Sequence, residues 1–135
     1  MKKKIVGVLV DVNNNVVNVT RIEYDTNDND YLDVYYKVLN CDTFDIVTRR
    51  IGSSHYSIYC DDEGLFKEDN KPSAITFDGA RVVEVLVGNL FVCKHNDDGE
   101  TISLTDKEMD EIFEYVHSLK FGGLNENRNV LLLGL

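Results

Sequence analysis

Residues 81–95 have the sequence RVVEVLVGNLFVCKH, the longest apolar stretch in this chain of 135 residues. A stretch so rich in valine and leucine predicts a long central strand, because such side chains suit a half-buried pleated surface. Gly88 lies near its middle, so the strand is either continuous or broken or bulged at that glycine. Residues 96–99, NDDG, are typical of a hairpin turn, and residues 100–104 are expected to return from it.

Four shorter segments earlier in the chain also predict strands. Residues 5–10 and 16–24 are rich in valine and isoleucine and flank three asparagines, 13–15, that tolerate a left-handed backbone. This arrangement predicts a β-hairpin. Residues 44–47 predict a further strand, and residues 55–60 predict another because their side chains alternate in character.

Two segments predict helices. In residues 29–40, apolar side chains recur at helical spacing after a cluster of capping residue types at 27–30. Thr105 and Glu108 form a capping-box pattern at the start of a second helix, which we expect to end at glycines 122 and 123. The apolar stripe of this second helix is Met109, Ile112, Phe113, Val116 and Leu119. Together these segments predict an α+β fold, a mainly antiparallel β-sheet with one N-terminal helix and a C-terminal helix packed on it.

The length favours a single domain, residues 1–135. The polar segment 68–73 contains the only proline and is expected to be a loop. The last segment, residues 124–135, ends in VLLLGL, which should not lie in water. We expect this tail to dock on the body of the domain or on a partner subunit.

The composition indicates a globular protein with an acidic surface. The chain is 43% hydrophobic and 28% charged, with a formal net charge of −10. This charge disfavours DNA binding and adhesion to anionic membranes, both of which depend on lysine and arginine. The apolar run after the first residues ends at Asp11 and is too short for a secretion signal. We therefore expect a cytoplasmic protein whose three cysteines, Cys41, Cys60 and Cys93, are reduced thiols.

The sequence carries no recognisable catalytic motif. It has neither a glycine-rich phosphate-binding pattern nor the elbow pattern of a serine nucleophile. Cys93 and His95 share a strand face, but a zinc site needs further ligands, and we expect a core cysteine and a surface histidine instead. None of the three histidines has an evident orienting partner. We therefore predict a binding protein without a cofactor or metal rather than an enzyme.

The candidate binding residues are cationic or lie at the glycine that interrupts the long strand. Arginine pairs with phosphate or carboxylate through a planar fork, and Arg128 lies in an asparagine-rich segment after the last helix. Phe91 would offer a face to an aromatic ligand and Asn89 would bind its edge, although Phe91 would equally suit the core and Gly88 a bulge. The full candidate set is Asn89, Phe91, Arg128, Arg81, Arg21 and Phe121.

Three segments resemble a family of phage proteins, the Thoeris anti-defence protein 1 family. They are CDTFDIV at 41–47, IYCDDEGLF at 58–66 and VLVGN at 85–89, and the resemblance extends over about residues 1–123. Members of that family sequester a cyclic ADP-ribose isomer, such as glycocyclic ADP-ribose (gcADPR), made by a bacterial TIR-domain immune enzyme, and do not cleave it. They assemble as dimers or hexamers, and some also bind cyclic oligonucleotides at separate sites. The resemblance thus implies a sponge that inhibits Thoeris defence in the cytoplasm of an infected bacterium.

Two other functions stay open at this point. The first is an acidic protein-interaction module that inhibits a host protein, which the net charge of −10 favours. The second is a small nucleotide-cleaving enzyme, which would need a histidine or carboxylate pair in its pocket.

Overall fold

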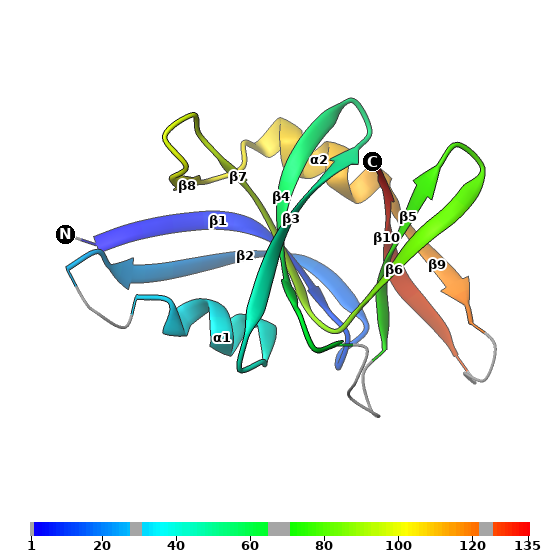
Figure 1. The fold of residues 1–135 in the computed structure, drawn as a ribbon, viewed down its shortest axis with the longest axis horizontal. Coiled ribbons are helices and arrows are strands. Elements are labelled where there is room, and N and C mark those ends of the chain that lie inside the picture. Colours follow the sequence, from blue (N-terminus) through cyan, green and yellow to red (C-terminus); the bar gives the residue numbers. More distant parts are fainter. Residues whose placement is uncertain (1, 28–30, 65–70, 122–125) are drawn as a thin grey trace.

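The computed structural model describes residues 2–27, 31–64, 71–121 and 126–135, which form ten strands and two helices (Figure 1). Figure 1 shows the long β1–β2 hairpin with α1 along one side of it, while β5, β6, β9 and β10 gather in the other half of the molecule. The elements are β1 Lys2–Asp11, β2 Val16–Asp25, α1 Asp33–Leu39, β3 Phe44–Ile51, β4 Ser54–Asp61, β5 Pro72–Asp78, β6 Arg81–Val87, β7 Leu90–His95, β8 Thr101–Ile102, α2 Asp106–Glu114, β9 Val116–Lys120 and β10 Asn127–Gly134.

All described strands belong to one hydrogen-bonded array. Its order is β2-β1-β7-β4-β3-β10-β5-β6, with β8 beside β7 and β9 beside β10. The sheet is mixed, because β10 runs parallel to β5 while the other pairs are antiparallel. The sheet, expected to be mainly antiparallel, is therefore a mixed one with one parallel pair among those described. The segment between β5 and β10 is long enough to bring the chain back in the same direction, as parallel pairing requires.

The apolar stretch 81–95 is broken at Gly88, as one of the sequence alternatives predicted. Gly88 has φ 93°, a left-handed value that glycine adopts without strain, and its N–H donates to the Lys71 carbonyl at 2.9 Å. The part before the break, β6, pairs with β5 at the edge of the array, whereas β7 lies in the middle between β1 and β4. The single apolar stretch 81–95 thus supplies two strands, one at the edge of the array and one between β1 and β4.

The first helix is shorter than predicted and does not lie at the N-terminus. It covers Asp33–Leu39 and follows the β1–β2 hairpin, and its N-cap residue, Leu32, makes no capping bond through its side chain. Residues 28–30 of the predicted capping cluster lie outside the described residues. The helix ends at Asn40, which takes a left-handed conformation with φ 53°. Asparagine tolerates that conformation, so it ends the helix close to the predicted end at residue 40.

The second helix begins as predicted but ends early. The Thr105 hydroxyl accepts from the Glu108 N–H at 3.2 Å, and the Glu108 carboxylate accepts from the Thr105 N–H at 2.9 Å, which completes the capping box. The helix stops at Glu114, and Val116–Lys120 forms β9, which pairs with β10. Pairing with the next strand along the chain therefore overrides the local helical pattern.

The array also contains features that the sequence interpretation did not include. Pro72 and Ser73, expected in a loop, begin strand β5. Of the apolar tail, Asn127–Gly134 forms strand β10, which pairs with β3, β5 and β9. No helix in the described part of the chain is long and apolar enough to cross a membrane.

The core consists of two clusters. The larger contains aliphatic side chains of β1, β4, β7, α2 and β10. The smaller lies beneath α1 and is largely aromatic, with Tyr35, Tyr59 and Phe91 among its buried members. Tyrosine brings a hydroxyl that needs a partner when buried, so the second cluster combines apolar packing with polar groups.

Candidate ligand-binding site

A cleft of about 480 Å³ opens beside the aromatic cluster. It lies between α1, the open end of the β1–β2 hairpin, the β3–β4 pair and the β7–β8 turn. Five aromatic side chains line it: Tyr24, Tyr31, Tyr35, Phe44 and Tyr59. Concave sites of roughly 300–1,000 Å³ with aromatic walls and a few polar groups are typical of small-molecule binding.

The aromatic rings form a buried floor and an open rim. Tyr35 and Tyr59 are the floor, stacked with ring centroids 4.5 Å apart and planes 7° apart. Tyr24 stands between floor and rim, 6.0 Å from the Tyr35 ring and 5.7 Å from the Tyr31 ring. Tyr31 is 43% exposed, so its ring is available to a ligand. A flat ring that enters the cleft would meet aromatic surface on its way in.

A hydrogen-bonded set of polar side chains completes the floor. His95 Nδ1 lies 2.7 Å from the Ser57 hydroxyl, and its Nε2 lies 3.0 Å from the Thr101 hydroxyl and 3.1 Å from the Tyr59 hydroxyl. The Tyr59 and Thr101 hydroxyls are 2.7 Å apart. The expectation that His95 is a surface histidine without an orienting partner is therefore wrong. Its partners come from β4 and β8, which no local sequence pattern brings together.

The surroundings keep His95 and the floor tyrosines uncharged. Burial, and then the positive charge of Lys3, lower the pKa of His95 below its usual value. Burial raises the pKa of Tyr59 and of Tyr35, and the nearby Tyr59 hydroxyl adds to the effect on Tyr35. At neutral pH the floor therefore presents a neutral imidazole and protonated hydroxyls.

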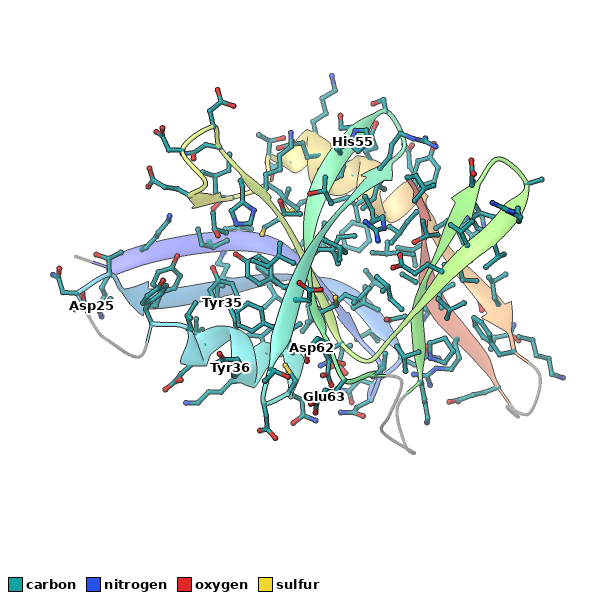
Figure 2. The ribbon with its side chains drawn as sticks, in the orientation of Figure 1. Asp25, Tyr35, Tyr36, His55, Asp62 and Glu63 are labelled. Carbon is teal, nitrogen blue, oxygen red and sulfur yellow. The ribbon has the colours of Figure 1, made fainter. Side chains whose placement is uncertain are left out.

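One floor hydroxyl lacks a partner. Tyr35 is 2% exposed, and within the described residues its Oη makes no hydrogen bond. Buried polar groups are nearly always hydrogen-bonded, so a buried hydroxyl without a partner at the edge of a cleft indicates a position where a ligand atom could bind. Figure 2 shows Tyr35 on the side of α1 that faces the sheet and Tyr36 on the outer side of the helix.

Charged side chains stand at the rim of the cleft. The Lys3 ammonium lies 4.0 Å from the Glu100 carboxylate, a loose pair in which the lysine side chain is 26% exposed and the glutamate 62% exposed. A ligand anion would separate so long an ion pair at little cost. Within the described ranges, no group of three or more His, Cys, Asp and Glu side chains is arranged to hold a metal ion. The arrangement suits a ligand with a flat ring and a negative group, held without a metal.

Two predicted site residues lie together, but away from this cleft. The Asn89 amide accepts from the Val12 N–H at 3.0 Å and donates to the Val38 carbonyl at 3.1 Å. Arg128 Nη2 donates to the Val12 carbonyl, and its Nη1 donates to Glu126 at 2.8 Å. We call Val12, Asn89 and Arg128 the Val12 hub. Since Arg128 is only 2% exposed, its guanidinium ties β10 to the end of β1 and is not open to a ligand in this structure.

Of the two alternatives that the sequence left open for Phe91, the structure shows the core position and not the open stacking surface. Its ring is 0% exposed and packs edge-on against Tyr35 and Tyr59, at centroid distances of 6.3 Å in both cases. A Cβ atom at Gly7 would lie 2.6 Å from Phe91 Cζ, so only glycine allows the ring to lie this close to β1. Phe91 supports the floor of the cleft from behind.

The other candidate residues are dispersed. Arg81 has a side chain that is 78% exposed, 3.8 Å from Asp78. Arg21 is exposed on β2 opposite Val6, and Phe121 is half-buried just after β9. None of these three lines the cleft.

Two of the cysteines behave as the sequence predicted. Cys60 and Cys93 are buried, and burial raises their pKa values to about 11 and about 12 respectively. The acidic Asp45 beside Cys60 adds to the effect there. Thiols in such surroundings stay protonated at neutral pH and are poor nucleophiles.

The cleft residues were missed because each had a simpler local interpretation. Tyr31 and Tyr35 were assigned to the apolar face of a helix, and Tyr59 to an alternating strand. The available signal was the count of seven tyrosines in a chain with no tryptophan. Tyrosine combines an apolar ring with a polar tip, so a high count indicates surfaces that are partly buried and partly wet.

Comparisons with known proteins identify a family. No curated protein and no solved structure is detectably similar to the chain. A family model described as a domain of unknown function, DUF3846, matches residues 3–117. The match covers β1 through the start of β9 and so includes every element that lines the cleft. The chain therefore belongs to the DUF3846 family.

Proposed function

We propose that this protein binds a small nucleotide in the aromatic cleft and sequesters it without converting it. The ligand class is a cyclic ADP-ribose isomer such as gcADPR. By holding this signal, the protein would inhibit Thoeris defence as a phage anti-defence sponge in the cytoplasm of an infected bacterium. The observation that carries the proposal is the cleft itself, with aromatic rings at its rim and a neutral hydrogen-bonding floor.

The cleft matches the two parts of such a ligand. Its volume of about 480 Å³ lies within the range of small-molecule sites. The exposed ring of Tyr31 would stack on adenine, a contact worth roughly 1–3 kcal/mol per base. Lys3 at the rim would pair with the pyrophosphate once Glu100 releases it. A dianionic ligand and an acidic protein otherwise repel each other, so the positive charge of Lys3 is important for the affinity of the cleft for the ligand.

The site supports binding over catalysis. His95 Nε2 is occupied by the Thr101 and Tyr59 hydroxyls, and Nδ1 by Ser57. The histidine therefore has no nitrogen directed at a substrate. The two buried thiols are protonated, for the reason given above. A sponge needs none of these groups as a nucleophile or base.

Homo-oligomers belong to the same proposal. The resemblance implies a homodimer or hexamer, and a second subunit would bring further cations to the dianion. It also implies that cyclic oligonucleotides bind at a second site. Both are proposals that rest on the resemblance, and measurement of the molar mass with and without ligand tests the first.

A release experiment tests the proposal. The purified protein is incubated with gcADPR, filtered to remove free ligand, and then heated. We expect the signal to be depleted from the filtrate and recovered intact after heating. Signal that is depleted but not recovered would indicate an enzyme. Tyr31→Ala should leave more of the signal in the filtrate than wild type does, whereas the matched variant Tyr115→Ala, at an exposed ring outside the cleft, should behave as the wild type.

A second candidate function is an acidic protein-interaction module that inhibits a host protein. The observation that favours it is helix α2, which carries Asp106, Glu108, Asp110, Glu111 and Glu114 within nine residues. Glu111 is held by the Ser53 and Tyr56 hydroxyls, so part of this acidic surface is fixed in place. gcADPR that is never depleted from the filtrate would favour this function over the sponge.

A further inference from the structure

We infer that the Tyr35 hydroxyl is the hydrogen-bond donor that selects the ligand of the aromatic cleft, and that the group it recognises is an acceptor atom of a purine base. This inference rests on the proposed function and deepens it. It names the residue that determines specificity and the part of the ligand that the residue contacts.

The position of Tyr35 is fixed by its neighbours. The residue lies in the middle of α1, and its ring is stacked on Tyr59 at 4.5 Å with Phe91 edge-on beside it. The side chain is 2% exposed and lines the cleft. A ring packed in this way has one orientation, so its hydroxyl is held at one point of the floor.

The neighbouring polar groups do not satisfy this hydroxyl. The Tyr59, Thr101 and His95 atoms are paired with one another at 2.7–3.1 Å. The Tyr24, Tyr59 and Thr101 hydroxyls are near enough to shift the pKa of Tyr35, but within the described residues none of them makes a hydrogen bond of normal geometry with Tyr35 Oη. The fold therefore keeps a buried donor unpaired next to a cleft, where a ligand atom is able to complete it.

The protonation state of Tyr35 decides which atom it would bind. Burial raises its pKa far above neutral, so the hydroxyl keeps its proton. The ligand atom must then accept a hydrogen bond, as a carbonyl oxygen or an unprotonated ring nitrogen does.

The walls of the cleft decide where that acceptor lies. Tyr24 and Tyr31 are adjacent rings that lead from the rim to Tyr35. A ligand in contact with all three must carry its acceptor on the edge of a flat ring. A purine offers ring nitrogens on both of its rings and more stacking area than a pyrimidine, so a purine fits this path better.

A purely structural explanation makes the opposite prediction. If Tyr35 were selected only for its ring, its hydroxyl would be an unpaired buried group, and phenylalanine would serve the ligand equally well. Tyr35→Phe therefore separates the two explanations, because it keeps the ring stack and removes only the hydroxyl.

The test compares wild type, Tyr35→Phe and Tyr36→Phe. Tyr36 is the matched control, since it is the next residue on the same helix and does not line the cleft, although its ring packs at 5.1 Å on the cleft residue Phe44. Calorimetry measures the affinity of each protein for gcADPR. Competition with adenosine and with cytidine measures the preference for a purine, and a thermal melt gives the melting temperature of each variant. We expect Tyr35→Phe to bind at least tenfold more weakly, to lose the preference for adenosine over cytidine, and to melt no lower than wild type. Tyr36→Phe should bind as wild type does.

The possible failures are distinguishable. Wild type that binds gcADPR, together with Tyr35→Phe that binds it equally, overturns this inference alone. A lower melting temperature for Tyr35→Phe also overturns it, because the hydroxyl would then have a partner inside the protein. Wild type that binds neither gcADPR nor adenosine overturns the proposed function, and the inference with it.

Discussion

The Val12 hub and the aromatic cleft both contain buried polar side chains, yet they use them differently. In the hub, the side chains of Asn89 and Arg128 are buried and bind the N–H and carbonyl of Val12, and of these groups only Arg128 Nε has no hydrogen-bond partner within the described residues. In the cleft, a tyrosine hydroxyl is buried without a partner and the rings above it are exposed. The contrast teaches that an isolated arginine or asparagine in an apolar region serves the backbone as readily as it serves a ligand.

The hub exists because the strand pairing of β1 ends there. The β1–β7 pairing runs from Val8 to Val10, so Val12 lies beyond it and needs other partners. Side chains of Asn89 and Arg128 supply them. Nearby, Asn15 receives the Asn129 N–H at 2.8 Å, which fixes the start of β10 to the first hairpin turn.

The largest effect should come from Phe91→Ala, which removes the ring behind the cleft floor. Full burial of the side chain predicts a loss of about 4 kcal/mol in the free energy of unfolding. Urea denaturation measures it, and Phe113→Ala, at an exposed ring, is the control with a change below about 1 kcal/mol. A stable Phe91→Ala that fails only in ligand binding would restore Phe91 as a stacking surface.

The next largest effect should come from Arg128→Ala in the hub. The change leaves the Val12 carbonyl without a partner and opens a cavity, so we expect a loss of about 3 kcal/mol in the free energy of unfolding. The matched control is Arg81→Ala, whose exposed pair with Asp78 should contribute less than about 0.5 kcal/mol. If Arg128→Ala were as stable as wild type yet lost the ligand, the hub would be the binding site and the comparison would reverse.

A smaller effect on stability and a selective effect on binding should come from Tyr31→Ala at the cleft rim. The ring is 43% exposed, so the free energy of unfolding should change by less than about 0.5 kcal/mol. Loss of a stacking contact should weaken gcADPR binding about tenfold. Calorimetry with Tyr31→Ala and Tyr115→Ala in parallel checks this, and equal affinities would remove the rim from the site.

The smallest effect should be the pH dependence contributed by His95. Burial and the charge of Lys3 lower its pKa in the folded protein, so the unfolded chain binds the proton more readily. The stability that neutral His95 contributes is therefore complete above the usual histidine pKa of 6.5 and is lost as the pH falls through the lower, folded value. Between about pH 8 and about pH 5, wild type should lose more free energy of unfolding than His95→Gln. The two proteins share the same carboxylates, so the difference between them reports on His95 alone. An equal pH dependence of the free energy of unfolding in both proteins would contradict this prediction.

Local features of the fold were predictable from the sequence. The asparagine turn of the first hairpin, the capping box at Thr105 and the break at Gly88 each depend on a few adjacent residues with defined conformational preferences. The end of α2 was not predictable in this way. Val116 and Leu119 continue the helical pattern, but this segment pairs with β10, the next strand along the chain, and such a contact between elements is not visible in the local pattern of either one.

The candidate site was the least predictable part for the same reason. Its floor joins Tyr35 of α1, Tyr59 of β4 and His95 of β7, which lie far apart in the sequence. Each residue alone fits an ordinary helix or strand. Sequence reasoning instead favoured Asn89 and Arg128, whose polarity is conspicuous in an apolar region but which bind the backbone of Val12.

NMR of selectively labelled protein during a gcADPR titration tests the central claim most directly. Ring signals of Tyr31 and Tyr35 report on the cleft, while the Asn89 side-chain amide and the Arg128 Nε–H report on the hub. The cleft as binding site predicts that the tyrosine signals shift and saturate together and that the hub signals stay in place. Hub signals that shift while Tyr31 and Tyr35 stay unchanged would contradict it.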